Sequence, residues 1–242
     1  MASERYVIGN LKMAMDKNEV ASYLKVINKK DLNDHVIIFP TSIYVPYFLN
    51  QSYRVGIQDV YYESDGPYTG EVSPLQARSM GITCTLVGHS ERRLNFHEND
   101  NVVNKKVLEA LANNLAVILC IGETLEEKEL LKTDRVLKKQ ITYALRYVKD
   151  YSKIMIAYEP VWAIGTRTTP KNEEIEKTIQ YIKDLVSKQF GYNDIKVLYG
   201  GSVDDENINT ISKIDNLDGV LVGKSSIDAD KFLNIIEVVL GK

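Results

Sequence analysis

The sequence predicts an α/β protein in which eight strand–helix units close into a (βα)8 barrel. Short runs rich in Val, Ile, Leu and Tyr recur along the chain, and longer stretches with amphipathic spacing separate them. An open doubly wound sheet would normally carry a glycine-rich dinucleotide turn after its first strand, and this sequence has none there. Eight units at this chain length therefore favour a closed barrel.

The predicted elements follow in order along the chain. Most of the strand candidates are almost continuously apolar, as strands covered on both faces of a parallel sheet should be. The eight candidates are residues 6–8, 36–39, 55–57, 85–87, 117–120, 154–157, 196–199 and 219–222. Between the sixth and seventh candidates, residues 174–182 have the apolar spacing of an amphipathic helix. After the eighth candidate, residues 228–240 are predicted to form the final helix.

Composition narrows the class of function. The 242 residues are 44% hydrophobic and 26% charged, which is typical of a folded protein, and no linker or low-complexity stretch divides them. We therefore expect a single domain over residues 1–242. A net charge of -3 gives no general attraction to nucleic acid or anionic lipid, so a small substrate is favoured.

Targeting and redox features predict a cytoplasmic protein. The longest apolar run, residues 115–121, is far shorter than the ~18 residues of a membrane helix, and residues 1–5 lack an apolar signal segment. Cys84 and Cys120 each lie inside an apolar strand-like segment, so we expect buried free thiols instead of a disulfide or a metal site.

Polar residues cluster directly after the predicted strands. They are Asn10 and Lys12 after the first strand, Gln58 after the third, His89 after the fourth, Glu123 after the fifth and Glu159 after the sixth. In a parallel barrel the carboxyl ends of all strands meet at one rim, where the active sites of this fold are built. We therefore expect these side chains to converge.

Glycine-rich turns follow the seventh and eighth strands, at residues 200–202 and 223–226. Glycine allows close backbone approach, and successive N–H groups can face an anion, so these turns predict a phosphate site. A short helical turn before the final helix would add a favourable dipole. The alternative is that the glycines only make tight turns.

Glu159 stands where the sixth strand must end, because Pro160 cannot continue the strand ladder. The apolar residues 161–166 follow where a loop is expected, which suits a lid that excludes water from the site. The alternative is permanent packing of these residues on a neighbouring helix.

His89 and Lys12 are candidates for charge stabilisation. A lone histidine is more often structural, but a helical turn opening at Ser90 would keep the ring of His89 neutral and able to donate to a carbonyl. Lys12 would supply a cation where enolate and phosphate charge develops, or it is an ordinary solvated lysine.

Four stretches now identify a family. They are residues 9–13 (GNLKM), 88–93 (GHSERR), 157–166 (AYEPVWAIGT) and 199–203 (YGGSV). In these stretches, and along essentially its whole length, the chain resembles the triosephosphate isomerase family. The resemblance implies a TIM barrel that interconverts dihydroxyacetone phosphate and D-glyceraldehyde 3-phosphate through an enediolate, in glycolysis and gluconeogenesis, with no metal or organic cofactor.

The resemblance also implies a role for each matching residue. Glu159 resembles the base, His89 the neutral electrophile and Lys12 the electrostatic stabiliser, while Asn10 resembles a donor that orients the substrate. The implied phosphate donors are the backbone N–H groups of Gly165, Ser202, Gly223 and Lys224. Glu91 and Ser90 are similar to the family's supporting residues behind the catalytic groups. The implied lid comprises Pro160, Val161, Trp162, Ala163, Ile164, Gly165 and Thr166.

Residues 66–71 (GPYTGE) resemble a projecting loop of the family that docks into a second subunit. The resemblance implies a homodimer in which Thr69 contacts the neighbouring site, beside Lys12 of the partner subunit and Asn10 of the partner subunit.

The sequence departs from the family at several positions. Leu11 and Ala14 stand where tryptophan and asparagine are usual, and Lys224 replaces a glycine, which predicts weak extra attraction for substrate. Residues 167–170 (RTTP) make the second lid hinge two residues shorter than is common. A shorter hinge has fewer soft dihedrals, so we expect an altered lid equilibrium and a lower turnover.

Two rival functions stay open at this point. One is a catalytically silent barrel that serves as a binding or scaffold protein, against which the presence of all four catalytic side chains argues. The other is a different phosphate-binding barrel, such as an indole or phosphoribosyl isomerase, which gives no reason for the stretch 157–166.

Overall fold

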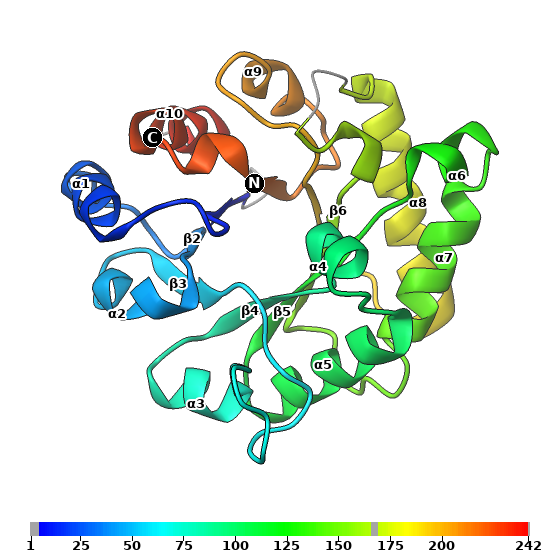
Figure 1. Cartoon of the computed structure of the whole chain (residues 1–242). Coiled ribbons are helices and arrows are strands. Elements are labelled where there is room, and N and C mark those ends of the chain that lie inside the picture. Colours follow the sequence, from blue (N-terminus) through cyan, green and yellow to red (C-terminus); the bar gives the residue numbers. More distant parts are fainter. Residues whose placement is uncertain (1–4, 166–168, 242) are drawn as a thin grey trace.

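A closed barrel of parallel strands forms the centre of the molecule (Figure 1). The computed structural model describes residues 5–165 and 169–241. Within these ranges each strand pairs in parallel with the next along the sequence, and the last strand returns to pair with the first. The strands are β1 (Tyr6–Asn10), β2 (Val36–Phe39), β3 (Arg54–Ile57), β4 (Cys84–Val87), β5 (Ala116–Ile121), β6 (Ile154–Tyr158), β7 (Lys196–Tyr199) and β8 (Gly219–Val222). The predicted (βα)8 barrel is confirmed.

Helices surround the strands, as Figure 1 shows. In the described residues the α-helices are α1 (Lys17–Ile27), α2 (Val45–Phe48), α3 (Pro74–Ser79), α4 (Ser90–Asn95), α5 (Asp100–Ala112), α6 (Leu125–Glu129), α7 (Thr133–Ala144), α8 (Asn172–Phe190), α9 (Ile208–Ile211) and α10 (Ala229–Leu240). The 3-10 turns are η1 (Ser42–Tyr44), η2 (Val161–Ala163) and η3 (Lys224–Ser226). None of the described helices combines the length and apolarity that crossing a membrane requires.

The predicted elements agree closely with the observed ones. Strands β2, β7 and β8 coincide with their predicted ranges, and the other five extend one or two residues further. β1 continues through Gly9 and Asn10 because these residues pair with β2, although neither residue belongs to an apolar run. The predicted final helix is α10, which starts one residue later because the side chain of Asp228 caps it.

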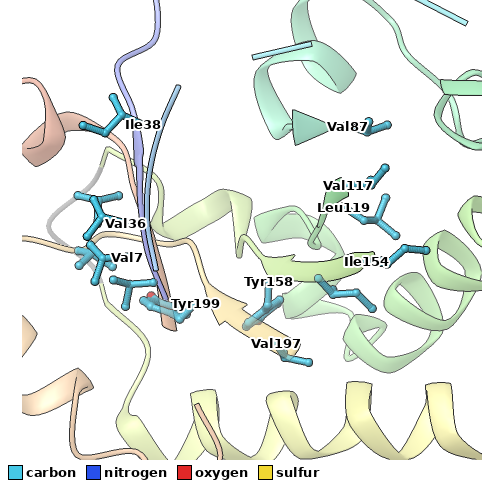
Figure 2. Close-up of a cluster of buried hydrophobic side chains, with 14 of the residues drawn as sticks. Val7, Val36, Ile38, Val87, Val117, Leu119, Ile154, Tyr158, Val197 and Tyr199 are labelled. Carbon is cyan, nitrogen blue, oxygen red and sulfur yellow. The ribbon is translucent and has the colours of Figure 1, made fainter. Parts of the chain in front are cut away.

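The strands build two cores, because successive side chains of a strand point to opposite faces; of the strands described, only β3 contributes to the outer core alone. The inner core fills the barrel and comprises Ile8, Ile37, Phe39, Cys84, Leu86, Ile118, Cys120, Ala157, Leu198 and Leu221. The outer core lies between the strands and the helices, and Figure 2 shows part of it, including Val7, Val36 and Ile38. Burial on both faces explains why the strand sequences are almost continuously apolar. Both cysteines are buried free thiols, as predicted.

Candidate active site

Glu159 follows β6 and lies buried at the rim of the barrel, with 2% of its surface exposed. Its backbone N–H donates to the carbonyl of Ile121 at 2.7 Å, which adds one residue to the ladder before Pro160 ends it. Carboxylate Oε1 lies 3.2 Å from Nε2 of His89, and Oε2 accepts a hydrogen bond of 3.2 Å from the N–H of Ser90. Two residues predicted from their strand ends are therefore in direct contact.

His89 precedes α4 and acts as its N-cap. Its Nδ1 accepts a hydrogen bond of 3.2 Å from the backbone N–H of Glu91, so Nδ1 carries a lone pair and the ring proton is on Nε2. In this tautomer the Nε2–H faces the carboxylate of Glu159. Asn10 lies beside this pair, with Nδ2 3.3 Å from Nε2.

Lys12 follows β1 with a left-handed backbone φ of 53°. For a residue with a Cβ atom such a conformation costs about 1–3 kcal/mol and persists only where surrounding contacts hold it. Its ammonium pairs with Oε1 of Glu91 at 2.6 Å. A Cβ atom at Gly223 would lie 3.1 Å from Cε of Lys12, so the lysine side chain crosses directly over this glycine.

The turns after β7 and β8 contain the predicted phosphate donors. Within the described part of the chain, the N–H groups of Ser202 and Gly223 make no hydrogen bond, so they are available to an anion. Lys224 is exposed and opens η3, the short turn expected before the final helix. Oγ of Ser226 lies 2.7 Å from the carbonyl of Gly223 and 3.1 Å from that of Asn10, which ties β8 to β1.

Gly165, the fourth predicted phosphate donor, makes no hydrogen bond to these turns among the described residues. It is exposed, and its φ is 68°. The remaining predicted lid residue, Thr166, and hinge residues 167 and 168 lie outside the described residues.

The first part of the predicted lid is anchored through Trp162. Its Nε1–H donates to Oε1 of Glu123 at 2.8 Å, and the hydroxyl of Tyr158 donates to the same oxygen at 3.1 Å. The ammonium of Lys128 lies 3.4 Å from the centre of the Trp162 ring and pairs with Glu174 at 2.8 Å. Burial raises the pKa of Glu123, and the hydrogen bonds from the tryptophan and the tyrosine oppose this shift.

A buried ionic cluster supports α4 from behind. Lys106 is 2% exposed and pairs with Asp59 at 2.6 Å and with Glu98. Arg92 of α4 pairs with the same two carboxylates, at 2.8 Å from Asp59. Burial raises the pKa of Asp59 to about 6, although Lys106 opposes the shift. The cluster links α4, the helix that His89 caps, to the loop after β3.

Thr69 is not part of this rim. It lies in an exposed loop, where the N–H of Tyr61 donates to the carbonyl of Val72 at 2.8 Å and so ties the two ends of the loop together. The ring of Tyr68 packs on that of Tyr61, with centroids 4.6 Å apart. The hydrogen bond and the ring contact therefore hold this exposed loop together.

Sequence reasoning assigned no role to several residues that the structure brings to the site. Glu123 and Gln58 were identifiable as polar residues at strand ends, yet their contacts to the lid and to Lys12 were not. Lys128 carries no sequence signal at all, because it meets Trp162 only through the packing of α6 beside the lid.

The site combines a buried carboxylate, an imidazole and an ammonium at the carboxyl rim, beside glycine-rich turns with free N–H groups. This combination is typical of (βα)8-barrel enzymes that move protons on phosphorylated substrates. The family model for triosephosphate isomerase matches residues 5–239. A triosephosphate isomerase of Thermodesulfovibrio yellowstonii is 39% identical over 97% of this chain and 99% of its own length.

Two further relatives carry the same name. That of Debaryomyces hansenii is 39% identical, covering 98% of this chain and 99% of the relative. That of Alkaliphilus oremlandii is 42% identical over 76% of each chain. The chain belongs to the triosephosphate isomerase family. Its activity is the interconversion of dihydroxyacetone phosphate and glyceraldehyde 3-phosphate, an isomerisation of glycolysis, which excludes the silent-barrel and phosphoribosyl alternatives.

Proposed function

We propose that Glu159 is the general base of this isomerisation and transfers the proton between the two adjacent carbons of the triose phosphate. The observation that carries the proposal is the contact of its buried carboxylate with Nε2 of His89 at 3.2 Å. A carboxylate removed from water is a stronger base toward a bound carbon acid than a hydrated one. The reaction then passes through an enediolate without a bound cofactor.

His89 is proposed to be the electrophile. One Nε2 proton cannot serve both the carboxylate of Glu159 and the carbonyl oxygen of a substrate. We therefore propose that substrate binding takes this proton donor from Glu159, which polarises the substrate carbonyl and frees the carboxylate to act as a base. Asn10, whose amide lies beside the same nitrogen, orients the substrate oxygen.

Lys12 is proposed to stabilise the negative charge that develops on the enediolate and to attract the phosphate. Its side chain crosses Gly223, one of the proposed phosphate donors, and its ion pair with Glu91 holds the ammonium there. Glu91 thus supports the lysine, and Ser90 supports the resting carboxylate through its N–H.

The phosphate group is proposed to bind the N–H groups of Ser202, Gly223 and Lys224 at the ends of β7 and β8, where two of these groups have no partner in the described chain. The N–H of Gly165 would join them only after the lid moves. This requires Trp162 to leave its contacts with Glu123 and Lys128, so these contacts oppose closure.

A homodimer is proposed through the loop around Thr69. Large apolar side chains are also exposed in the loops after β1 and β2, among them Met13 at 92% and Ile43 at 72%. Such exposure is typical of a surface that another subunit covers. Sedimentation equilibrium is expected to give twice the chain mass of 27.4 kDa, and a single-chain mass would contradict the dimer.

We also propose that residues 1–242 act as one catalytic domain in the cytoplasm.

The Glu159→Gln variant tests the assignment of the base. It keeps the size of the side chain and removes the proton acceptor, so kcat is expected to fall by at least ~100-fold. Competition by inorganic phosphate should persist, because the phosphate donors are untouched. Glu126→Gln, at an exposed position on α6, is the matched control and should leave kcat unchanged. Retained activity in Glu159→Gln would contradict the proposal.

A further inference from the structure

The backbone of Lys12 is held from both sides of its Cα atom. On the amino side, its N–H donates to Oδ1 of Asn10 at 3.1 Å. On the carboxyl side, its carbonyl oxygen accepts two hydrogen bonds from side chains, at 2.8 Å from Oγ1 of Thr41 and at 2.9 Å from Nε2 of Gln58. Both peptide planes that flank the left-handed φ are therefore restrained.

The two side-chain donors follow the second and third strands of the barrel, which come after the strand that carries Lys12. Thr41 follows β2, and Gln58 follows β3. The hydroxyl of Thr41 makes no capping bond with its own 3-10 turn η1, although the residue occupies the N-cap position. Nε2 of Gln58 also donates, at 3.0 Å, to the carbonyl of Phe39, the last residue of β2. Both donors are thus directed away from local structure and toward β1 and β2.

The direction of a side chain follows from the backbone that carries it, since φ and ψ fix the orientation of the Cα–Cβ bond. In the left-handed conformation, the side chain of Lys12 crosses Gly223 and reaches Glu91. If Lys12 relaxed to an ordinary negative φ, its Cβ would point elsewhere and the ammonium would leave this position. The surrounding hydrogen bonds must hold the strained conformation.

We propose that Thr41 and Gln58 are positioning residues for the isomerase, which clamp the carbonyl of Lys12 and so aim its ammonium at the charge of the bound phosphate and enediolate. This inference rests on the role proposed above for Lys12. Neither residue touches the substrate in this scheme. Their contribution reaches the reaction only through the lysine.

Thr41→Val and Gln58→Met each remove one donor and keep most of the side-chain volume. Misplacement of a catalytic group by about 1 Å is enough to lower turnover severely, so each variant is expected to lower kcat/KM by about 10-fold to 100-fold. Thr41→Ser keeps the hydroxyl and is expected to restore wild-type values. Melting temperature and sedimentation of each variant show whether it is folded and associated as the wild type is. If one of the two variants does not fold, the other carries the test.

A double-mutant cycle separates an effect through Lys12 from general damage. The measured quantity is the Kd of 2-phosphoglycolate, an anion with the charge pattern of the enediolate phosphate. Thr41→Val should weaken binding in the wild-type background and cause no further weakening in Lys12→Met. Equal weakening in both backgrounds, or wild-type kcat/KM in both Thr41→Val and Gln58→Met, would overturn the clamp.

The experiments distinguish a failure of the role proposed for Lys12 from a failure of the clamp formed by Thr41 and Gln58. Wild-type kcat/KM in Lys12→Met alone would remove the lysine from the mechanism. Severe loss in Lys12→Met together with unaffected Thr41 and Gln58 variants would remove only the clamp.

Discussion

A Cβ atom at Gly200 would lie 2.9 Å from Cγ of Glu159 and 3.5 Å from its Oε1. The N–H of Gly200 donates to the carbonyl of Tyr158 at 2.8 Å, so the turn after β7 is tied to the end of β6 that carries the glutamate. Gly200 was predicted from sequence to serve either a phosphate site or a tight turn. The contact adds a third reason for glycine there, because it leaves space for the resting carboxylate.

Gly200→Ala is therefore expected to displace Glu159 from its contacts with His89 and Ser90. The backbone φ at this position is not left-handed, so alanine adds little strain, and kcat should fall by at least about 10-fold. Gly191→Ala is the contrasting control: its φ of 69° predicts a loss of stability of about 1 kcal/mol and an unchanged kcat. Steady-state kinetics and thermal unfolding of both variants check this. Wild-type kcat in Gly200→Ala would show that the contact does not matter.

Trp162 is the one tryptophan of the sequence, so intrinsic fluorescence reports on the lid anchor. Lys128→Met removes the cation from the ring, a contact worth about 0.5–1 kcal/mol at such a partly exposed site. We expect a shifted emission in the free enzyme and a smaller spectral change on saturation with 2-phosphoglycolate. Glu174→Gln, which removes only the ion pair of Lys128, should have a weaker effect. An unchanged spectrum in Lys128→Met would contradict an anchoring role.

Asp59 predicts a pH dependence of stability. Burial raises its pKa from 3.8 to about 6, so the folded protein binds this proton more tightly than the unfolded chain. The resulting stabilisation is complete below about pH 4 and is lost as the pH rises through about 6. Asp59→Asn should therefore flatten the slope of the unfolding free energy between pH 4 and pH 6.

Urea unfolding at fixed protein concentration measures this slope, since association would otherwise change the apparent stability. Asp184→Asn, at an exposed position, provides the control and should keep the wild-type slope. A wild-type slope in Asp59→Asn would show that the ion pairs with Lys106 and Arg92 outweigh burial.

Lys224 predicts a small, salt-dependent contribution to substrate binding. Its side chain is exposed beside the proposed phosphate donors, so its attraction is screened within about 10 Å at 0.1 M salt. Lys224→Gly is expected to raise KM by about twofold at low ionic strength and to weaken the dependence of KM on salt. Backbone donation by residue 224 survives the substitution. Unchanged KM and unchanged salt dependence would exclude the attraction.

Much of the architecture was predictable because it depends on local patterns. Apolar runs gave all eight strands within two residues at each end, since burial on both faces leaves a direct compositional trace. The convergence of Asn10, His89 and Glu159 followed from parallel topology alone. The strand ends were less predictable. Pairing at Gly9 and Asn10 depends on backbone hydrogen bonds, and the type of side chain does not indicate where these bonds stop.

The sequence by itself determined the barrel, the rim on which the polar side chains meet and, through its motifs, the family. Only the tertiary structure decided how these groups are held. The left-handed Lys12 beneath the side chains of Thr41 and Gln58, the anchoring of Trp162 by Glu123, and the burial of Asp59 all join loops that are far apart in the chain. Whether such contacts form depends on shifts of a few tenths of an ångström in the packing of neighbouring elements. Residue type and spacing along one strand carry no information about these shifts.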